Sequence, residues 1–157
     1  EIGKARILRK GNDITIVGIS HMVIESLRAH KHLENNGISA EVIDPIWLSP
    51  LDIDTISASV EKTGRLLVVD TGWLPCGAGA EICMQVIERL QGCKQIIVER
   101  TGFVHTPCPT TKSLENLFYP NSSTIAAQAF TMVYPDAKPW IPKGEEAEEI
   151  TKFKGPF

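Results

Sequence analysis

Two runs of consecutive apolar residues constrain the fold of this chain more than any other feature. One spans residues 14–19 and is dense in β-branched side chains, and the other spans residues 65–70, where Leu-Leu-Val-Val precedes an aspartate. Strands this uniformly apolar are typical of parallel sheets that are covered on both faces. We therefore expect a mostly parallel sheet with a layer of helices on each side.

Amphipathic segments alternate with strand-like runs along the chain, as βα units require. The predicted strands cover residues 6–9, 14–19, 38–44, 65–70 and 95–99. The predicted helices cover residues 20–36, 50–63, 78–90 and 122–133, with Ser20 and Ser49 as expected N-caps and Gly37 and Gly64 as expected ends. A tight turn at residues 11–13 links the first two strands and favours an antiparallel first strand. The predicted fold class is thus three-layer α/β, with an open sheet of about five strands and one antiparallel edge strand.

Helical spacing assigns the faces of the first helix. Met22, Ala29 and Leu33 fall on the buried side, whereas Glu25 falls on the solvent side. His30 lies beside the apolar stripe, so we expect a half-buried and hydrogen-bonded core histidine.

Composition divides the chain and excludes several classes of protein. Residues 1–134 form one predicted domain, and residues 135–157, rich in Pro and Glu, form a predicted arm. The 157 residues carry a net charge of −3, which argues against a nucleic-acid binder, and no apolar run is long enough to predict a membrane span. The first residues show neither an initiator Met nor a signal segment, which indicates a piece of a longer protein. Four Cys residues suggest free thiols in a reducing compartment, either the cytoplasm or, in a eukaryote, the mitochondrial matrix.

Several residues are candidates for a ligand site or a protein interface. His21 follows a strand and opens a helix, which is where α/β sheets place functional groups. Trp73 and Leu74 lie on an apolar loop after a second strand, where aromatic anchors commonly become interface hot spots. His105 lies three residues before Cys108, but the sequence around them does not supply the other ligands that a zinc site needs. Trp140 and Phe157 lie on the arm, which either docks in an extended form on a neighbour or is disordered.

A glycine-rich turn at the start of the third helix leaves two interpretations open. Gly77 and Gly79 resemble a dinucleotide-binding turn, but the third glycine position holds Ile82. Gly77, Gly79 and Glu81 are also candidates for an interface. A free-standing nucleotide-binding module is one hypothesis. Small residues that allow the helix to approach the sheet closely are the other, simpler one.

The assembled pattern of motifs resembles one known family. The segments that carry the resemblance occur in order at residues 3–6, 11–17, 37–44, 48–52, 60–66, 72–73, 77–82, 101–102, 107–109 and 114–115. Together they resemble the C-terminal domain of the β subunit of pyruvate dehydrogenase and related 2-oxo acid dehydrogenases, which has the transketolase C-terminal fold. The resemblance covers about residues 3–133, and residues 1–5 look like the junction with a preceding pyrimidine-binding domain.

The resemblance implies a function for the parent enzyme. The parent would use thiamin diphosphate and Mg²⁺ to decarboxylate a 2-oxo acid and would pass the acyl group to a lipoyl carrier. The cofactor would lie between an α subunit and the preceding domain of the β subunit, so this segment is expected to hold no catalytic, cofactor-binding or metal-binding residue. Its implied role is assembly, through contacts with other subunits such as a separate α subunit and docking of a lipoyl acyltransferase. The apolar loop and the arm predict a homodimer with another β subunit.

Two departures from the family keep an alternative open. Members often carry an acidic residue where Val104 and His105 stand, and they usually end soon after the last helix, whereas this chain continues to Phe157. Both departures bear on acyltransferase docking. The alternative is the C-terminal domain of a transketolase or deoxyxylulose-phosphate synthase, which needs no lipoyl partner.

Overall fold

The computed structural model describes residues 1–142, apart from the side chain of Asn116. Its five-stranded sheet has the order β1-β3-β2-β4-β5, with one antiparallel and three parallel pairings. The elements are β1 (Arg6–Arg9), β2 (Ile14–Gly18), α1 (Met22–Glu34), β3 (Ala40–Asp44), α2 (Ile53–Thr63), β4 (Arg65–Val69), α3 (Ala78–Leu90), β5 (Ile97–Thr101), α4 (Lys112–Phe118) and α5 (Ser122–Val133). The predicted fold class is confirmed.

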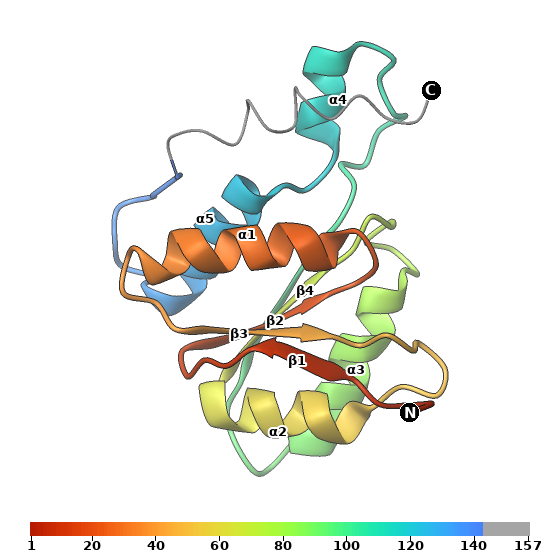
Figure 1. Ribbon diagram of the computed structural model, residues 1–157, viewed down its shortest axis with the longest axis vertical. Helices are drawn as coiled ribbons and strands as arrows, with labels where there is room; N and C mark the ends of the chain where they lie inside the picture. Colours follow the sequence, from red (N-terminus) through yellow and green to blue (C-terminus); the bar gives the residue numbers. More distant parts are fainter. Residues whose placement is uncertain (143–157) are drawn as a thin grey trace.

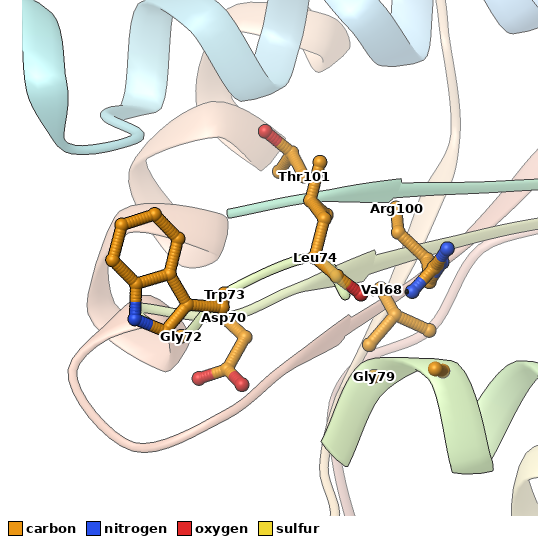
Figure 2. Close-up of a pocket in the computed structure, with 9 residues that line it drawn as sticks. Val68, Asp70, Gly72, Trp73, Leu74, Gly79, Arg100 and Thr101 are labelled. Carbon is orange, nitrogen blue, oxygen red and sulfur yellow. Dashed lines mark hydrogen bonds between the residues drawn. The ribbon is translucent and has the colours of Figure 1, made fainter. Parts of the chain in front are cut away.

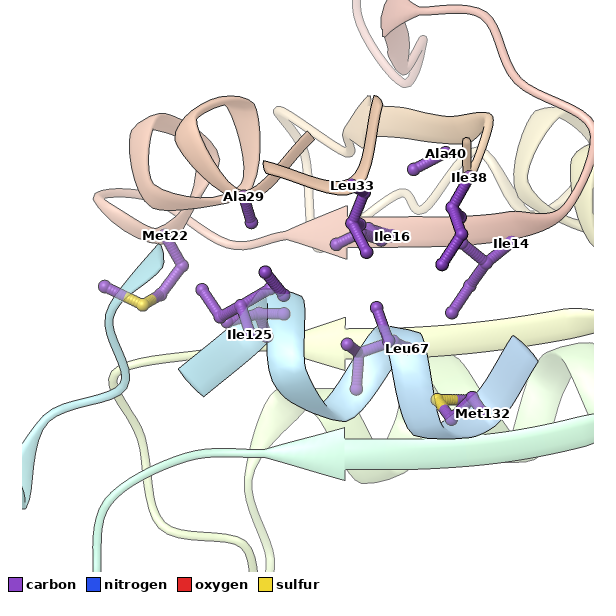
Figure 3. Packing of buried hydrophobic residues seen from close by; sticks show 13 residues of the cluster. Ile14, Ile16, Met22, Ala29, Leu33, Ile38, Ala40, Leu67, Ile125 and Met132 are labelled. Carbon is purple, nitrogen blue, oxygen red and sulfur yellow. The ribbon is translucent and has the colours of Figure 1, made fainter. Parts of the chain in front are cut away.

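Two helical layers enclose the sheet, as the apolar strands required (Figure 1). Helices α1 and α5 cover one face, where Leu33 and Ile125 pack on Ile16 and Leu67 (Figure 3). Helices α2 and α3 cover the other face, and every residue of β2 is buried. Burial of this apolar surface is the main favourable contribution to folding.

The antiparallel strand β1 pairs with a different strand from the one that was predicted. The turn at residues 11–13 suggested pairing with the next strand, but β1 pairs with β3, starting from Arg6 opposite Asp44. The connection crosses the start of β3, where the amides of Asn12 and Asp13 both donate to the Ser39 carbonyl at 2.9 Å. Two parallel neighbours, β3 and β4, therefore flank β2 and leave it no free edge.

A buried polar network fastens this crossing to α2. The Glu41 carboxylate accepts from the Gly11 amide at 3.2 Å and from Lys62 Nζ at 2.6 Å, and the Thr15 hydroxyl lies 2.7 Å from Ser59 Oγ. Burial by itself raises the pKa of Glu41, but these hydrogen bonds and the Lys62 charge outweigh it and hold the pKa below its usual value. The ionised carboxylate is therefore a structural part of the layer between β3 and α2.

Two predicted N-caps are wrong. Helix α1 begins after His21, and Ser20 lies in the turn with a left-handed φ of 56° instead of capping the helix. Helix α2 begins three residues later than expected, because Asp52, not Ser49, accepts from the Thr55 amide at 3.2 Å. An aspartate is as good an N-cap as a serine, so the choice between the two depended on tertiary contacts. Gly37 and Gly64 adopt the expected left-handed geometry.

The region after α3 differs most from the prediction. Strand β5 is shifted two residues toward the C-terminus, because a turn centred on Gly92 occupies the residues after α3. Helix α4 was not predicted. It has seven residues, and Leu114 and Leu117 are exposed, so it has no apolar stripe that the sequence pattern could reveal.

Glu25 was predicted to face solvent, but its side chain is buried at the start of α5. Its carboxylate accepts from the Ser122 amide at 2.8 Å and pairs with Arg28 at 2.7 Å. A carboxylate is stabilised by the free amides and the positive dipole of a helix N-terminus. This contact joins the two helices of one layer. His30 is buried as expected, with Nδ1 3.0 Å from the Ala40 carbonyl.

After α5 the described chain runs back along its own domain. Trp140 packs on Phe130 with ring centroids 5.2 Å apart. Residues 143–157, which include the acidic run and Phe157, lie outside the described part of the chain. None of the helices within residues 1–142 has the length and apolar character that crossing a bilayer would demand.

We expect Gly11→Ala to destabilise the domain, because a Cβ at this position would lie 2.2 Å from the Ala40 carbonyl carbon. Since backbone atoms cannot move aside, the expected loss in the free energy of unfolding is about 3 kcal/mol, measured by urea denaturation. Gly37→Ala is the control: its Cβ meets nothing within 4 Å, so only the left-handed φ of 74° costs energy, about 1 kcal/mol. Equal losses in the two variants would contradict the close approach at Gly11.

Candidate functional site

The carboxyl ends of the four parallel strands meet at one edge of the sheet. Strand β2 lies between β3 and β4, and the helices that follow β2 and β4 cover opposite faces. The loops after β2 and β4 therefore diverge at this point, which is where open α/β sheets place ligand or partner sites. His21 follows β2 here, while Trp73 and Leu74 follow β4.

The loop after β4 is held firmly against the end of β5. The Phe103 amide donates to the Gly72 carbonyl at 3.0 Å, and Arg100 donates to the Leu74 carbonyl at 2.7 Å. Figure 2 shows Trp73 and Arg100 on either side of Leu74. These contacts present Trp73 and Leu74 at the surface on a fixed backbone, with 47% and 37% of their areas exposed.

Five rings form a continuous aromatic cluster beside this loop, consisting of Trp73, Phe103, His105, Phe118 and Tyr119. Phe103 is central: its ring centroid lies 5.9 Å from that of Trp73, 4.8 Å from Phe118 and 5.2 Å from Tyr119. The His105 ring lies 5.5 Å from Trp73. The structure thus brings together two predicted interface residues, Trp73 and His105, that are 32 positions apart.

An open groove of about 490 Å³ adjoins the aromatic cluster. Its lining residues are Leu74, Pro75, Arg100, Thr101, Gly102, Phe103, Val104, His105 and Gln128. The lining is mainly apolar, with Arg100 and His105 as its basic side chains, so the groove suits an apolar or partly acidic protein segment.

The glycine-rich start of α3 packs closely against the sheet. The cavity there measures about 10 Å³, which is enough for one water molecule. Gly79 is buried, and a Cβ there would lie 3.2 Å from Val68 Cγ1, so Gly79 lets α3 approach the sheet. Gly77 occupies the N-cap position, and Glu81 faces solvent and accepts from Gln85 at 2.8 Å. The geometry matches the packing interpretation of this turn.

The titratable groups with shifted pKa values have structural causes. Burial raises the pKa of Cys83 to about 11, so this thiol stays protonated and unreactive at neutral pH. A hydrogen bond to Cys108 raises the pKa of Tyr119, whose hydroxyl lies 3.8 Å from the sulfur. Throughout residues 1–142, no three His, Cys, Asp or Glu side chains are grouped closely enough to hold a metal ion.

Other predicted interface residues are not among the five rings of the aromatic cluster. His21 is exposed at the start of α1, and Trp140 packs against Phe130 of α5. Phe157 is outside the described residues. Phe118 and Tyr119 were not predicted as site residues, because the seven-residue helix α4 has no periodic apolar pattern that would reveal it.

Comparison with known proteins gives a consistent match over most of the chain. The family described as "Transketolase, C-terminal domain" matches residues 3–125. The mitochondrial pyruvate dehydrogenase E1 component subunit beta of Pisum sativum is 47% identical over 128 residues, which are 82% of this chain and 36% of the pea protein. The beta subunit of acetoin:2,6-dichlorophenolindophenol oxidoreductase from Cupriavidus necator is 42% identical over 81% of this chain and 38% of its own length.

A solved structure supports the same relationship. It is described as a split gene transketolase in an inactive beta4 tetramer, with a TM-score of 0.73 and 27% identity over 85% of this chain and 43% of that one. This chain therefore spans less than half the length of the proteins that it matches.

We expect the aromatic cluster to depend on Phe103 for stability and to carry Trp73 as a surface residue. Phe103→Ala removes three ring contacts and should lower the free energy of unfolding by about 2–3 kcal/mol. Trp73→Ala should cost less than about 1 kcal/mol, because nearly half of this side chain is already exposed. Urea denaturation of both variants tests the difference, and a larger loss for Trp73→Ala would show that Trp73 serves its own domain.

Proposed function

This chain belongs to the transketolase C-terminal domain family, and we propose that it is the assembly domain of the β subunit of a thiamin diphosphate-dependent 2-oxo acid dehydrogenase. The parent enzyme would decarboxylate a pyruvate-type 2-oxo acid and pass the acyl group to a lipoyl carrier. One observation carries the proposal: a domain 47% identical to part of a pyruvate dehydrogenase β subunit presents a rigid aromatic surface at its carboxyl edge. Such surfaces are typical of protein interfaces.

The residues of this domain do not fit the cofactor itself. The start of α3, the one predicted turn that resembles a phosphate site, has a cavity of about 10 Å³. By the family relationship, thiamin diphosphate and Mg²⁺ would bind elsewhere in the parent, between an α subunit and the preceding domain of the β subunit. When bound there, the cofactor would supply the carbanion chemistry of decarboxylation. Glu41 and Asp52 each accept a hydrogen bond from a backbone amide. Burial raises the pKa of both carboxyl groups, but their hydrogen bonds outweigh it and lower the pKa, which supports a scaffold role.

A second β subunit is the proposed partner of the aromatic surface. Trp73, Leu74 and Val104 expose between 37% and 50% of their areas around the groove, and exposed apolar groups of this kind mark interaction sites. A relative of known structure is described as a beta4 tetramer, which supports association among β chains. His21, on the neighbouring loop, would lie at the margin of this contact.

The other partners follow from the same family relationship. A separate α subunit would complete the enzyme, and a lipoyl acyltransferase would dock on the assembled complex, at a site other than the groove beside His105, where this chain lacks the acidic residue that the family often has. Trp140 and Phe157 would add contacts from the C-terminal arm. The pea relative is named mitochondrial, which supports the mitochondrial matrix for a eukaryotic source and the cytoplasm for a bacterial one.

A transketolase-type transferase remains the second candidate. The split gene transketolase covers 85% of this chain and, at 27% identity, is a more distant relative than the pea β subunit at 47%. The acetoin-oxidising relative at 42% widens the substrate class to 2-hydroxy ketones.

We expect activity only when this domain is part of a complete enzyme. Replacing the matched segment of the pea β subunit with residues 3–125 of this chain, and adding the pea α subunit, should give pyruvate-dependent reduction of 2,6-dichlorophenolindophenol. The isolated chain should give no heat with thiamin diphosphate and Mg²⁺ in titration calorimetry. Saturable cofactor binding by the isolated chain would contradict the proposal, as would a hybrid that does not assemble with the α subunit or that assembles without oxidising pyruvate.

We expect the isolated chain to form a homodimer through the aromatic surface. Sedimentation velocity at high micromolar concentration should show a dimer, and Trp73→Lys should shift it to monomer, because a buried unpaired charge is costly at an interface. Ile24→Lys on α1, where the side chain is 50% exposed, is the matched control and should leave the dimer intact. A monomer at all concentrations, or equal loss in both variants, would contradict this interface.

A further inference from the structure

A second apolar surface lies where β3 leads into α2, separate from the aromatic cluster. It consists of the exposed residues Ile2, Ile46, Trp47, Leu48 and Pro50, which we call the β3–α2 surface. The exposed fractions are 73% for Ile2, 48% for Ile46, 38% for Trp47 and 49% for Leu48. Residues 45–51 contain no charged side chain. Three consecutive exposed apolar side chains, at residues 46–48, are typical of a surface that another protein surface covers.

The loop that carries this surface is locked in shape. The Ile46 amide donates to Asp44 Oδ1 at 2.9 Å, and the Trp47 amide donates to the Pro45 carbonyl at 2.6 Å. Ile46 adopts a left-handed φ of 58°, a conformation that β-branched residues rarely take. The loop therefore holds its apolar side chains outward and does not fold them onto the domain.

The N-terminal residues run directly past this surface. The first residue of β1, Arg6, pairs with Asp44 at the carboxyl end of β3. The Ala5 amide then donates to Asp52 Oδ2 at 3.0 Å, and a Cβ on Gly3 would lie 3.0 Å from the Pro50 ring. Figure 1 shows the N-terminus beside the segment that joins β3 to α2. Any polypeptide attached before residue 1 thus starts in contact with the β3–α2 surface.

We propose that the β3–α2 surface docks the domain that precedes this one in the β subunit. The inference rests on the proposed function, under which this C-terminal domain makes up 36–38% of a longer chain, as in its relatives. The occupant is an apolar face of that preceding domain, since the surface offers no charge for a polar partner. A domain tethered within a few residues has an effective concentration in about the millimolar range, which favours it over a free second copy.

Hydroxyl-radical footprinting with mass spectrometry tests the proposal on two forms of the protein. One is the 157-residue chain alone, and the other is the same chain fused behind the part of the pea β subunit that precedes the matched segment. In the fusion, the modification rates of Trp47 and Leu48 should fall at least fivefold. Met84 on α3, 49% exposed, is the internal control and should keep its rate.

A matched pair of variants adds a second measurement on the fusion. Leu48→Lys should speed tryptic cleavage at Lys4 at least tenfold by releasing the docked domain, and Ile24→Lys should not change it. Circular dichroism of the isolated Leu48→Lys chain confirms that the domain itself still folds.

The outcomes separate docking from the proposed function. Unchanged modification of Trp47 in the fusion overturns the inference. Protection of Trp47 that appears equally in the isolated chain and rises with its concentration overturns it in favour of a second copy. Protection in the fusion without pyruvate oxidation after addition of the α subunit keeps the docking surface and rejects the proposed enzyme.

Discussion

Burial of β2 on both faces is the constraint from which the rest of the structure follows. All five of its residues are buried, so it needs a helical layer on each side and a strand on each edge. The Gly11 backbone lies directly against the backbone of β3 just before the chain enters β2. At this crossing, the ionised Glu41 carboxylate accepts a hydrogen bond from the Gly11 amide. Because parallel strands are joined by crossover helices, the carboxyl ends of the four parallel strands all lie at one edge of the sheet.

This shared edge explains why residues that are distant in the sequence lie close together in space. Loops after β4 and β5 meet because those strands pair in parallel, with Val69 opposite Thr101. Trp73 follows the first and His105 the second, and their rings lie 5.5 Å apart. The N-terminal residues reach the same edge for the opposite reason: β1 is antiparallel, so its start and not its end lies beside the exit of β3.

The sequence predicts those parts of this fold that depend on local pattern. Apolar runs locate β2 and β4, and Gly37 and Gly64 end their helices as expected, since a left-handed residue is a local requirement. Contacts between distant residues explain the errors. Asp52 became the cap of α2 because it also holds the Ala5 amide, and Glu25 became buried because α5 starts above it. Neither partner can be inferred from helical spacing.

The sequence predicted the exposed residues of the candidate site but not the residues that hold them in place, because those contacts are also tertiary. Trp73 and Leu74 stand out in the sequence because they are large apolar residues on a short loop after a strong strand. The residues that fix them, Phe103 and Phe118, come from a loop and a seven-residue helix without periodicity. Exposure is likewise a tertiary property, so Ile46 and Leu48 could equally have been core residues until the loop geometry placed them outside.

The separation of the two apolar surfaces itself bears on function. A single-partner domain would gain most from one continuous apolar patch, because hot spots cluster at the centre of an interface. Here the exits of β3 and β4 are divided by β2, whose own loop carries the polar pair Ser20 and His21. Two apolar surfaces with a polar strip between them fit a domain that joins two bodies at once, one attached through its own N-terminus and one that arrives from solution.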